Sequence, residues 1–335
     1  MKAAFAAIGK EGVLERVYDS AARAILAEKL DFIPPFTGLE ELETRKTEWK
    51  DVEFLFSTWG APKLNREQLE QYFPGLKAVF YAAGSVQEFA RPYLERGIRI
   101  FSAADANAAP VIEFTSAEIV LANKGFFRSA LLYSAGRYPE ARQYASAFPG
   151  NYDTPVGIIG AGKIGSGVIQ RLNDYRLNVR VFDPFLGAAD ARKLGAEKTD
   201  SLEELFKNCF VISNHLANNE QTRNMLDYRY FSLMGDYGVF INTGRGAQVV
   251  EDDLIRALTE KPGRTALLDV TWPEPVPGGH PFYTMDNVIL TPHIAGSGGR
   301  ELARMGMYMA DEFERYSTGA PLRREVTAEK LATLA

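Results

Sequence analysis

The sequence has few of the residues that build metal centres and covalent cross-links. Its 335 residues include one cysteine, Cys209, and three histidines, His215, His280 and His293. A single cysteine excludes an intramolecular disulfide and a cysteine-based zinc site, so we expect no metal. Cys209 itself lies in an apolar setting that is typical of a small core residue. Any chemistry that needs an imidazole must use one of the three histidines.

Long apolar runs and an excess of positive charge are also missing. No apolar stretch approaches the roughly 20 residues of a membrane-spanning helix, and residues 1–10 are too short and too weak a segment for a secretory signal. Lys and Arg number 38 against 43 Asp and Glu, a net charge of −5. This balance predicts no nucleic-acid partner and no membrane partner. We therefore expect a cytoplasmic protein, in which 46% hydrophobic residues suffice for sizeable cores.

The length indicates two domains rather than one. In the first part, short apolar runs predict strands at Val52–Thr58, Ala78–Tyr81 and Arg99–Ser102. Amphipathic stretches at Arg66–Tyr72 and Glu88–Glu95 lie between them. Strands that alternate with helices indicate βαβ units and a parallel sheet.

A second alternating series begins at Pro155. Before it, the apolar stretch Thr115–Leu132 predicts one buried helix, and Gly136–Asp153 is interpreted as a polar connector. Ser201 and Glu204 have the spacing of a capping box, and Gly298–Thr318 is again helical in pattern. The predicted strands of this series are Val156–Ile159, Val179–Asp183, Phe210–His215, Val239–Asn242, Ala266–Val270 and Val288–Leu290.

A glycine-rich motif follows the first strand of the second series. Gly160, Gly162 and Gly165 form G-x-G-x-x-G between a predicted strand and a predicted helix. The first glycine permits a tight turn, the second lets phosphates approach the backbone, and the third lets helix and strand pack closely. The helix N-terminus, from Lys163 and Ile164 onward, offers N–H groups to a pyrophosphate. Lys163 itself either contacts that pyrophosphate or is a solvated lysine.

An acidic residue ends the next predicted strand. Asp183 would accept hydrogen bonds from ribose hydroxyls and repel a 2′-phosphate, which favours NAD (NADH) over NADP as cofactor. The alternative is an ordinary aspartate in the turn before Pro184.

Taken together, these motifs resemble the D-isomer-specific 2-hydroxyacid dehydrogenase family, which includes glyoxylate/hydroxypyruvate reductases, D-lactate dehydrogenases and phosphoglycerate dehydrogenases. Order and spacing agree from about Ala108 to Tyr316. The matching segments are Gly160–Gly165, Asp183, Asn242–Gly246, Leu268–Val270 leading to Glu274-Pro275, and Thr291–Gly296.

The resemblance implies an α/β fold of two domains with a cleft between them. Residues 1–114 would form a flavodoxin-like substrate domain and residues 115–296 the Rossmann NAD-binding domain. The segment 297–335 would provide a C-terminal helix that packs back on the substrate domain. Family members are usually dimeric through the NAD domain, so a homodimer is expected.

The resemblance also implies an enzyme that interconverts a small-molecule 2-oxo acid and a D-2-hydroxy acid. Arg245 would hold the substrate carboxylate and carbonyl, which suits its planar guanidinium. His293 would act as the general acid and base, because imidazole titrates near neutrality. Glu274 is its expected partner and would orient the ring.

Other positions are assigned to the cofactor by the same resemblance. Asp269 would face the nicotinamide side, and Thr243 and Gly244 would offer backbone contacts to the ribose and nicotinamide. His215 is expected near the cofactor without a catalytic role. His280, in a Pro-Gly-Gly-His-Pro loop, is expected to lie on the surface.

The expected substrate loop departs from the family pattern. The family has Gly-x-Gly followed by Asp, whereas this chain has Ala82-Ala83-Gly84-Ser85 and is one residue shorter. Ala83, Gly84 and Ser85 remain the candidates for binding the substrate carboxylate. Trp59 and Trp272 are either packing residues or walls of a pocket for a larger substrate.

Two alternative functions share some of these features. Transcriptional corepressors of the same family work as NADH-gated binding modules, and the acidic charge and the absence of an extended polar tail make that role the less favoured one. A short-chain dehydrogenase would need Tyr-x-x-x-Lys, and no tyrosine here has a lysine four residues later.

Overall fold

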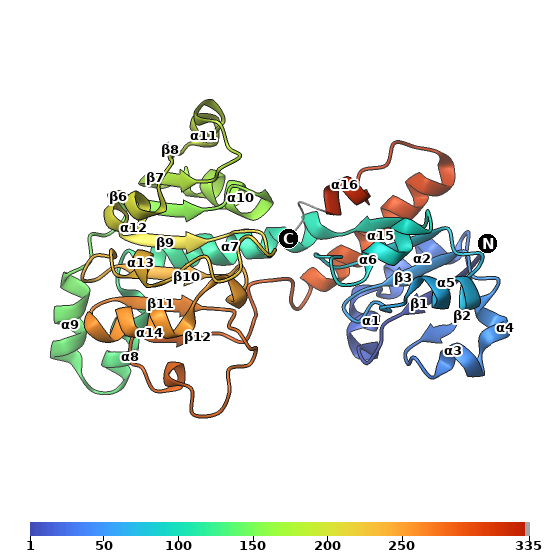
Figure 1. Cartoon of the computed structure of the whole chain (residues 1–335), viewed down its shortest axis with the longest axis horizontal. Helices are drawn as coiled ribbons and strands as arrows, with labels where there is room; N and C mark the ends of the chain where they lie inside the picture. Colours follow the sequence, from blue (N-terminus) through green and yellow to red (C-terminus); the bar gives the residue numbers. More distant parts are fainter. Residues whose placement is uncertain (332–335) are drawn as a thin grey trace. The chain divides into compact units, whose positions relative to one another are not determined.

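The chain divides into two compact units in the computed structural model, which describes residues 1–331 (Figure 1). Unit 1 contains Met1–Ala108 and the chain from Ser297 onward, and unit 2 contains Ala109–Gly296. The division lies inside helix α7 (Ala104–Ala122), slightly before the boundary expected between 114 and 115. The last four residues of the segment expected at 297–335 lie outside the described residues.

Unit 1 is built on a six-stranded sheet in the order β13-β5-β4-β3-β1-β2. All pairs are parallel except that of β13 with β5. The parallel strands have the flavodoxin-like order, as the sequence predicts. The strands are β1 (Lys2–Ala6), β2 (Asp31–Phe36), β3 (Phe54–Ser57), β4 (Ala78–Tyr81), β5 (Arg99–Ser102) and β13 (Glu325–Val326).

Helices cover both faces of this sheet. On one face α1 (Glu11–Val17), α2 (Ser20–Ala27) and the C-terminal α15 (Glu301–Thr318) pack on stacked aromatic rings, among them Phe56 and Phe80 with centroids 5.0 Å apart. The other face packs against a second buried cluster. Its helices are α3 (Glu41–Thr44), α4 (Lys46–Trp49), α5 (Arg66–Tyr72), α6 (Ala90–Glu95) and α16 (Ala328–Leu331).

Unit 2 is a Rossmann domain, as predicted. Its seven strands are all parallel, in the order β12-β11-β10-β9-β6-β7-β8. The chain order reverses between β6 and β9, which is where such sheets bind dinucleotides. The strands are β6 (Tyr152–Ile159), β7 (Arg176–Phe182), β8 (Glu197–Thr199), β9 (Val211–Asn214), β10 (Val239–Asn242), β11 (Thr265–Leu268) and β12 (Val288–Leu290).

Two buried clusters lie on the two faces of the unit 2 sheet. One is shared with α7, α10 (Lys163–Leu172) and α11 (Ala188–Leu194), the other with α12 (Leu202–Asn208), α13 (Tyr228–Phe231) and α14 (Glu251–Glu260). The short 3-10 helix η1 (Gly246–Gln248) follows β10, and a second one, η2 (Pro281–Tyr283), precedes β12. The Ser201 hydroxyl caps α12 by accepting from the Glu204 N–H at 3.2 Å.

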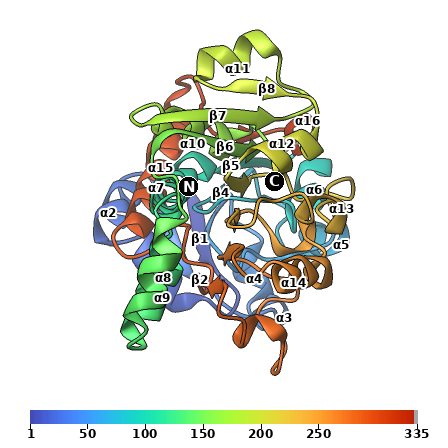
Figure 2. The ribbon, with the colours of Figure 1, turned by 90° about the vertical axis from the view of Figure 1, so that its left-hand side faces the viewer.

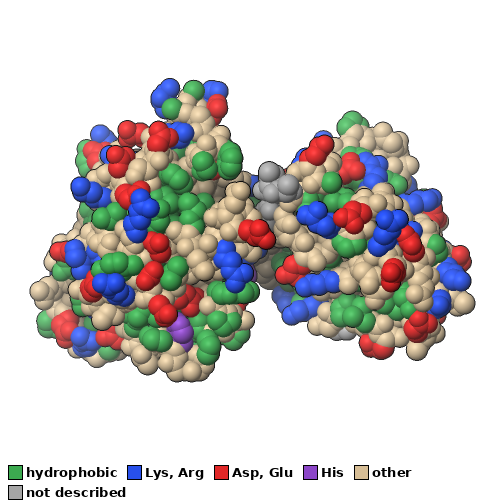
Figure 3. All heavy atoms as spheres, in the orientation of Figure 1, with side chains coloured by type: hydrophobic (Ala, Val, Ile, Leu, Met, Phe, Trp, Pro, Cys, Tyr) green, Lys and Arg blue, Asp and Glu red, His purple; other side chains and the backbone are tan. Residues whose placement is uncertain are grey.

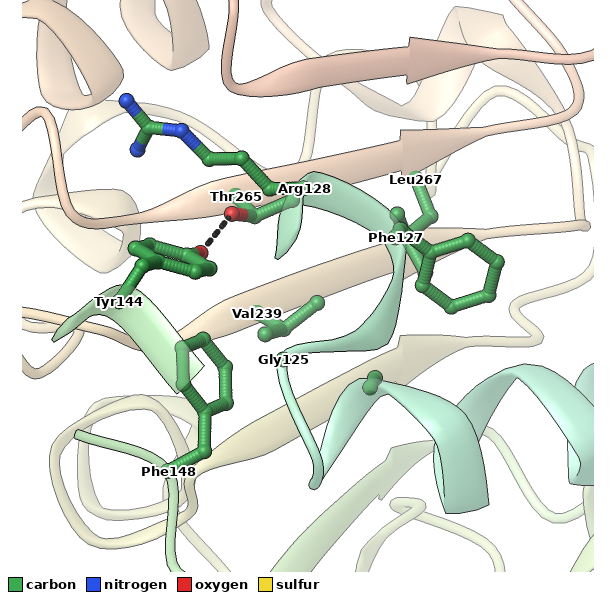
Figure 4. Close-up of a pocket in the computed structure, with 9 residues that line it drawn as sticks. Gly125, Phe127, Arg128, Tyr144, Phe148, Val239, Thr265 and Leu267 are labelled. Carbon is green, nitrogen blue, oxygen red and sulfur yellow. Dashed lines mark hydrogen bonds between the residues drawn. The ribbon is translucent and has the colours of Figure 1, made fainter. Parts of the chain in front are cut away.

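The segment between α7 and β6 differs from the prediction. Instead of one helix over Thr115–Leu132, α7 ends at Ala122 and α8 (Phe126–Ser134) starts after Gly125, whose φ of 64° breaks the helix. The expected connector contains α9 (Tyr138–Ser146), which forms a hairpin with α8 (Figure 2). Figure 4 shows how the hairpin is anchored: the Tyr144 hydroxyl lies 2.7 Å from Thr265 Oγ1, and Arg128 stacks over the Tyr144 ring.

The surface is of mixed charge. On the face in Figure 3, acidic and basic side chains are interspersed over each unit. Among the described helices, none combines the length and the apolar character needed to cross a membrane.

Candidate active site

The predicted site residues of unit 2 all follow the carboxyl ends of its strands. Because the strands are parallel, these ends meet at one edge of the sheet. Along that edge, the order is set by the strand order of the sheet. It runs from His293 after β12, through Asp269 after β11, Thr243–Arg245 after β10 and His215 after β9, to Gly160–Gly165 after β6 and Asp183 after β7.

The glycine loop has the geometry that a dinucleotide requires. Gly160 has a φ of 87°, and a Cβ there would meet the backbone of His215. A Cβ on Gly165 would meet the Gly160 carbonyl, so the start of α10 lies directly against the turn. In contrast, a Cβ on Gly162 would face open space. The loop is therefore tightly packed from behind and open where phosphates would approach.

Asp183 supports this loop directly. Its Oδ2 accepts from the Ala161 N–H at 2.7 Å, and its Oδ1 accepts from the Phe185 N–H at 2.8 Å. The carboxylate therefore shapes the glycine loop in addition to presenting charge beside it. Lys163 and Ile164 open α10, whose first N–H groups have no acceptors within the helix. This donor set fits the pyrophosphate of a dinucleotide.

His215 is buried behind the glycine loop. Its Nε2 lies 2.9 Å from the Ser213 hydroxyl, while Nδ1 is buried without a hydrogen-bond partner among the described residues. Burial lowers the pKa of His215 to about 4, so the ring is neutral at physiological pH. A neutral ring beside the loop fits the non-catalytic role expected for it.

The turn that bears Arg245 is fixed by an amide network. Asn214 Nδ2 donates to Gln248 Oε1 at 2.6 Å and to Asn242 Oδ1 at 3.1 Å. The Thr243 hydroxyl lies 2.8 Å from that of Thr115 on α7. Arg245 Nη1 donates to the Gly244 carbonyl at 2.7 Å. Gln248 was not among the predicted site residues, although a polar glutamine is unusual inside the otherwise apolar stretch Ala-Gln-Val-Val.

His293 and Glu274 are in direct contact. His293 Nδ1 lies 2.7 Å from Glu274 Oε1, and the two side chains are 45% and 42% exposed. His293 has a φ of 53°, an uncommon conformation for a residue other than glycine. The pair is therefore accessible to a ligand while its geometry is fixed by the loop.

Asp269 holds that loop. Its carboxylate is 3% exposed and accepts from the Thr291 hydroxyl at 2.6 Å and from the N–H groups of Ile294 and Ala295 at 2.8 and 3.0 Å. Its own carbonyl accepts from the His293 N–H at 3.0 Å. Asp269 therefore orients the segment around His293, a role beyond the predicted contact with the nicotinamide side of the cofactor.

A buried glutamate close to this assembly was also missed. Glu118 on α7 is 8% exposed, and its Oε2 has no hydrogen-bond partner among the described residues. Burial, together with the negative charge of Asp269, raises the pKa of Glu118 to about 8. The carboxyl is therefore largely protonated at neutral pH.

His280 is not the surface residue that the sequence suggested. Its side chain is 17% exposed, and its Nε2 lies 3.5 Å from Glu251 Oε2. The side chain turns inward for a local reason, because His280 Nδ1 caps η2 by accepting from the Phe282 N–H at 3.3 Å. Trp272 is 56% exposed, whereas Cys209 is buried in the core.

The candidate residues of unit 1 also follow strand ends. Trp59 comes after β3 and packs, partly buried, against both core clusters of the unit. Ala83, Gly84 and Ser85 come after β4. The Ser102 hydroxyl lies 3.0 and 2.7 Å from the carbonyl oxygens of Ala83 and Gly84, whereas the Gly84 and Ser85 N–H groups have no acceptor within the described residues.

No metal centre is evident. Within residues 1–331, no group of three or more His, Cys, Asp or Glu side chains is arranged to hold an ion.

Comparison with known proteins gives a consistent result. Residues 119–295 match the D-isomer specific 2-hydroxyacid dehydrogenase, NAD binding domain, so the cofactor of this domain is a nicotinamide dinucleotide. D-3-phosphoglycerate dehydrogenase of Methanocaldococcus jannaschii is 28% identical over 92% of this chain and 57% of its own length. Glyoxylate reductase of Aeropyrum pernix is 32% identical over 49% of each chain.

Among solved structures, the holo form of Rhodotorula graminis D-mandelate dehydrogenase has the same fold, with a TM-score of 0.81, 19% identity and 97% coverage of both chains. The chain thus spans little more than half of the phosphoglycerate dehydrogenase it matches but nearly all of this structural neighbour.

Proposed function

Because the chain belongs to the D-isomer specific 2-hydroxyacid dehydrogenase family, we propose that it is an NAD-dependent oxidoreductase that interconverts a 2-oxo acid and a D-2-hydroxy acid. The observation that supports this most directly is the His293–Glu274 contact of 2.7 Å at the carboxyl edge of the Rossmann sheet. A proton donor is what carbonyl reduction requires from the protein.

A nicotinamide dinucleotide held by the glycine loop and by Thr243 and Gly244 would supply or take up the hydride. The protein handles the proton. Glu274 accepts from Nδ1–H of His293, which leaves Nε2 to face the substrate. In the direction of reduction, Nε2–H donates its proton to the substrate oxygen as that oxygen becomes a hydroxyl. In the direction of oxidation, Nε2 accepts the hydroxyl proton, and Glu274 stabilises the resulting imidazolium.

Each unit is considered by itself for binding of the substrate carboxylate, and in unit 2 the proposed residue is Arg245. Arg245 offers a planar, always charged guanidinium that suits a carboxylate and the adjacent carbonyl. In unit 1 the loop Ala83–Ser85 offers the N–H groups of Gly84 and Ser85, while the Ser102 hydroxyl engages the carbonyl side of the loop. Trp59 is proposed to border this loop, and Trp272, largely exposed, to shape the substrate side of the site.

We propose NAD rather than NADP as the preferred dinucleotide. Asp183 presents a carboxylate at the end of β7, fixed by the Ala161 and Phe185 N–H groups. A fixed negative charge there accepts bonds from ribose hydroxyls and repels a 2′-phosphate. Gly160, Gly162, Lys163, Ile164 and Gly165 are assigned to the pyrophosphate, and Thr243, Gly244 and Asp269 to the nicotinamide end.

We propose that the protein is a homodimer through the α8–α9 hairpin. The hairpin carries apolar side chains that are between 49% and 62% exposed, namely Phe126, Leu131, Tyr133 and Tyr138. Exposed apolar groups gathered on one element are typical of a subunit interface. Light scattering should give a dimer for the wild type and a monomer for Leu131→Asp/Tyr133→Asp; a monomeric wild type would overturn the assignment.

The enzymatic proposal is tested by following NADH absorbance with a panel of 2-oxo acids, from glyoxylate, hydroxypyruvate and pyruvate to branched and aromatic members. Turnover of at least one acid, lost in His293→Ala, is the expected result. NADH binding without turnover of any acid would overturn the proposal and favour an NADH-gated binding module of the same family.

A further inference from the structure

Unit 2 contains a second histidine–carboxylate pair, Glu251 and His280. Glu251 is the first residue of α14, and its side chain is only 12% exposed. Its Oε2 lies 3.5 Å from His280 Nε2. Because His280 Nδ1 accepts from the Phe282 N–H, a neutral ring carries its proton on Nε2, toward Glu251.

The other oxygen of Glu251 contacts the segment that bears Glu274. Glu251 Oε1 accepts from the backbone N–H of Trp272 at 2.7 Å. Burial raises the pKa of the Glu251 carboxyl, while the Trp272 N–H and the neighbouring His280 act in the opposite direction. A hydrogen bond from a backbone N–H to a carboxylate is stronger than one between neutral groups.

The segment between Asp269 and Glu274 has few other anchors. Asp269 is fixed by its bonds to the loop of His293. Thr271 packs its backbone against Gly246, where a Cβ would collide with it, and its hydroxyl donates to the Pro273 carbonyl at 3.0 Å. Among the described residues, Glu251 is the outside side chain that binds the backbone just before Glu274, whereas just after it the Tyr283 hydroxyl donates to the Val276 carbonyl at 3.0 Å.

We propose that Glu251, supported by His280, is a positioning residue that holds the Thr271–Glu274 segment so that Glu274 stays in contact with His293. The proposal rests on the proposed function for its catalytic consequence. Glu251 does not touch the reacting atoms, and its effect passes through Trp272 to Glu274. The second carboxylate oxygen lies 3.5 Å from His280 Nε2, whose N–H attracts it and so disfavours rotation of the carboxylate.

Three variants separate positioning from stability. Glu251→Ala removes the acceptor, whereas Glu251→Gln keeps an oxygen for the Trp272 N–H. Asp253→Ala is a matched control, because Asp253 is also in the first turn of α14 and accepts a backbone N–H, that of Tyr228 at 3.1 Å. We expect kcat to fall about tenfold in Glu251→Ala, with NADH affinity unchanged. It should fall less in Glu251→Gln, which keeps the Trp272 contact but loses the one to His280, and should stay within about twofold of wild type in Asp253→Ala.

A double-mutant cycle provides the decisive kinetic result. If Glu251 acts through Glu274, Glu251→Ala should add little to the loss caused by Glu274→Gln, whereas Asp253→Ala should be independent of it. The pH profile of kcat/KM in Glu251→Ala should also move toward that of Glu274→Gln. Full additivity of Glu251→Ala and Glu274→Gln, or an unchanged pH profile, would overturn the proposal.

Hydrogen–deuterium exchange tests the same inference without turnover. Peptides covering 271–275 should exchange faster in Glu251→Ala than in the wild type, and Asp253→Ala should leave them unchanged. Unchanged exchange in Glu251→Ala would refute the anchoring role. If the wild type turns over no 2-oxo acid but the exchange result holds, the proposed function fails while the anchoring of the segment stands.

Discussion

Replacing Glu118 by Gln should make the protein more stable, and increasingly so as the pH rises. The Glu118 carboxyl is buried on α7 and lacks a partner for Oε2 among the described residues. Its pKa is raised from 4.5 to about 8, first by burial and then by the charge of Asp269. The folded state therefore retains a proton that the unfolded chain has already lost between these two pH values.

The sign follows from proton binding. Where the folded state binds more protons than the unfolded state, the free energy of unfolding falls as the pH rises. The loss of unfolding free energy caused by Glu118 is absent below pH 4.5, grows between pH 4.5 and 8, and is constant above pH 8. Raising the pKa from 4.5 to about 8 corresponds to about 5 kcal/mol at alkaline pH, of which about 2 kcal/mol develops between pH 6 and pH 8.

Urea unfolding followed by circular dichroism at pH 6, 7 and 8 measures this difference. The gain in unfolding free energy of Glu118→Gln over the wild type should grow by about 2 kcal/mol across that range. Glu113→Gln is the control, because Glu113 lies on the same helix but is 56% exposed in its ion pair with Arg171. If the unfolding free energies of the wild type and Glu118→Gln changed with pH in parallel, the assignment of a buried, protonated carboxyl would be refuted.

Three further outcomes are expected. His293→Ala should lower kcat by at least about a hundredfold while NADH affinity, measured by fluorescence titration, stays near wild type; retained turnover would place the proton donor elsewhere. Asp183→Asn, which keeps an oxygen for the Ala161 N–H, should reduce the NAD/NADP discrimination in kcat/KM with a smaller loss of NAD affinity than Asp183→Ala, and an unchanged ratio would contradict the ribose role. Burial lowers the pKa of His215 from 6.5 to about 4, so this group contributes stability that is present above pH 6.5 and is lost as the pH falls toward 4. In urea titrations between pH 6.5 and 4, His215→Gln should therefore lose less unfolding free energy than the wild type. Equal losses in the variant and the wild type would contradict this role of His215.

The glycine loop could be predicted because its signal is local. A strand, three spaced glycines and a helix lie within one short segment, and each glycine answers a steric demand that neighbouring residues create. The position of Asp183 beside this loop is likewise set by the register of β6 and β7, in which Ile159 pairs with Phe182. In such places the sequence contains the whole physical reason for the structure.

Strands that depend on distant partners were missed. β1 is mostly alanine, which has little intrinsic preference for strands, and it is extended because it pairs between β2 and β3. β2 contains Pro34 and Pro35, which argue against a strand in the sequence but are tolerated at a sheet edge.

The buried carboxyls were missed for a related reason. Glu118 and Glu251 are ordinary helical glutamates in the sequence, and only their packing partners distinguish them. Those partners, Asp269 and Trp272, are separated from them by many residues along the chain. Helical periodicity tells which residues share a face, but it does not tell which distant strand end that face will cover.

Unit 1 is assembled from both ends of the chain, and this has a consequence for synthesis on the ribosome. Its aromatic sheet face is covered by α15, which contributes Met305, Met309 and Phe313. This helix lies so close to α1 that a Cβ on Gly306 would collide with the Val17 carbonyl. Unit 2, in contrast, is continuous from Ala109 to Gly296. The second unit to be translated is therefore the first able to complete its core, while the strands made earliest must wait with Phe56 and Phe80 exposed until α15 emerges.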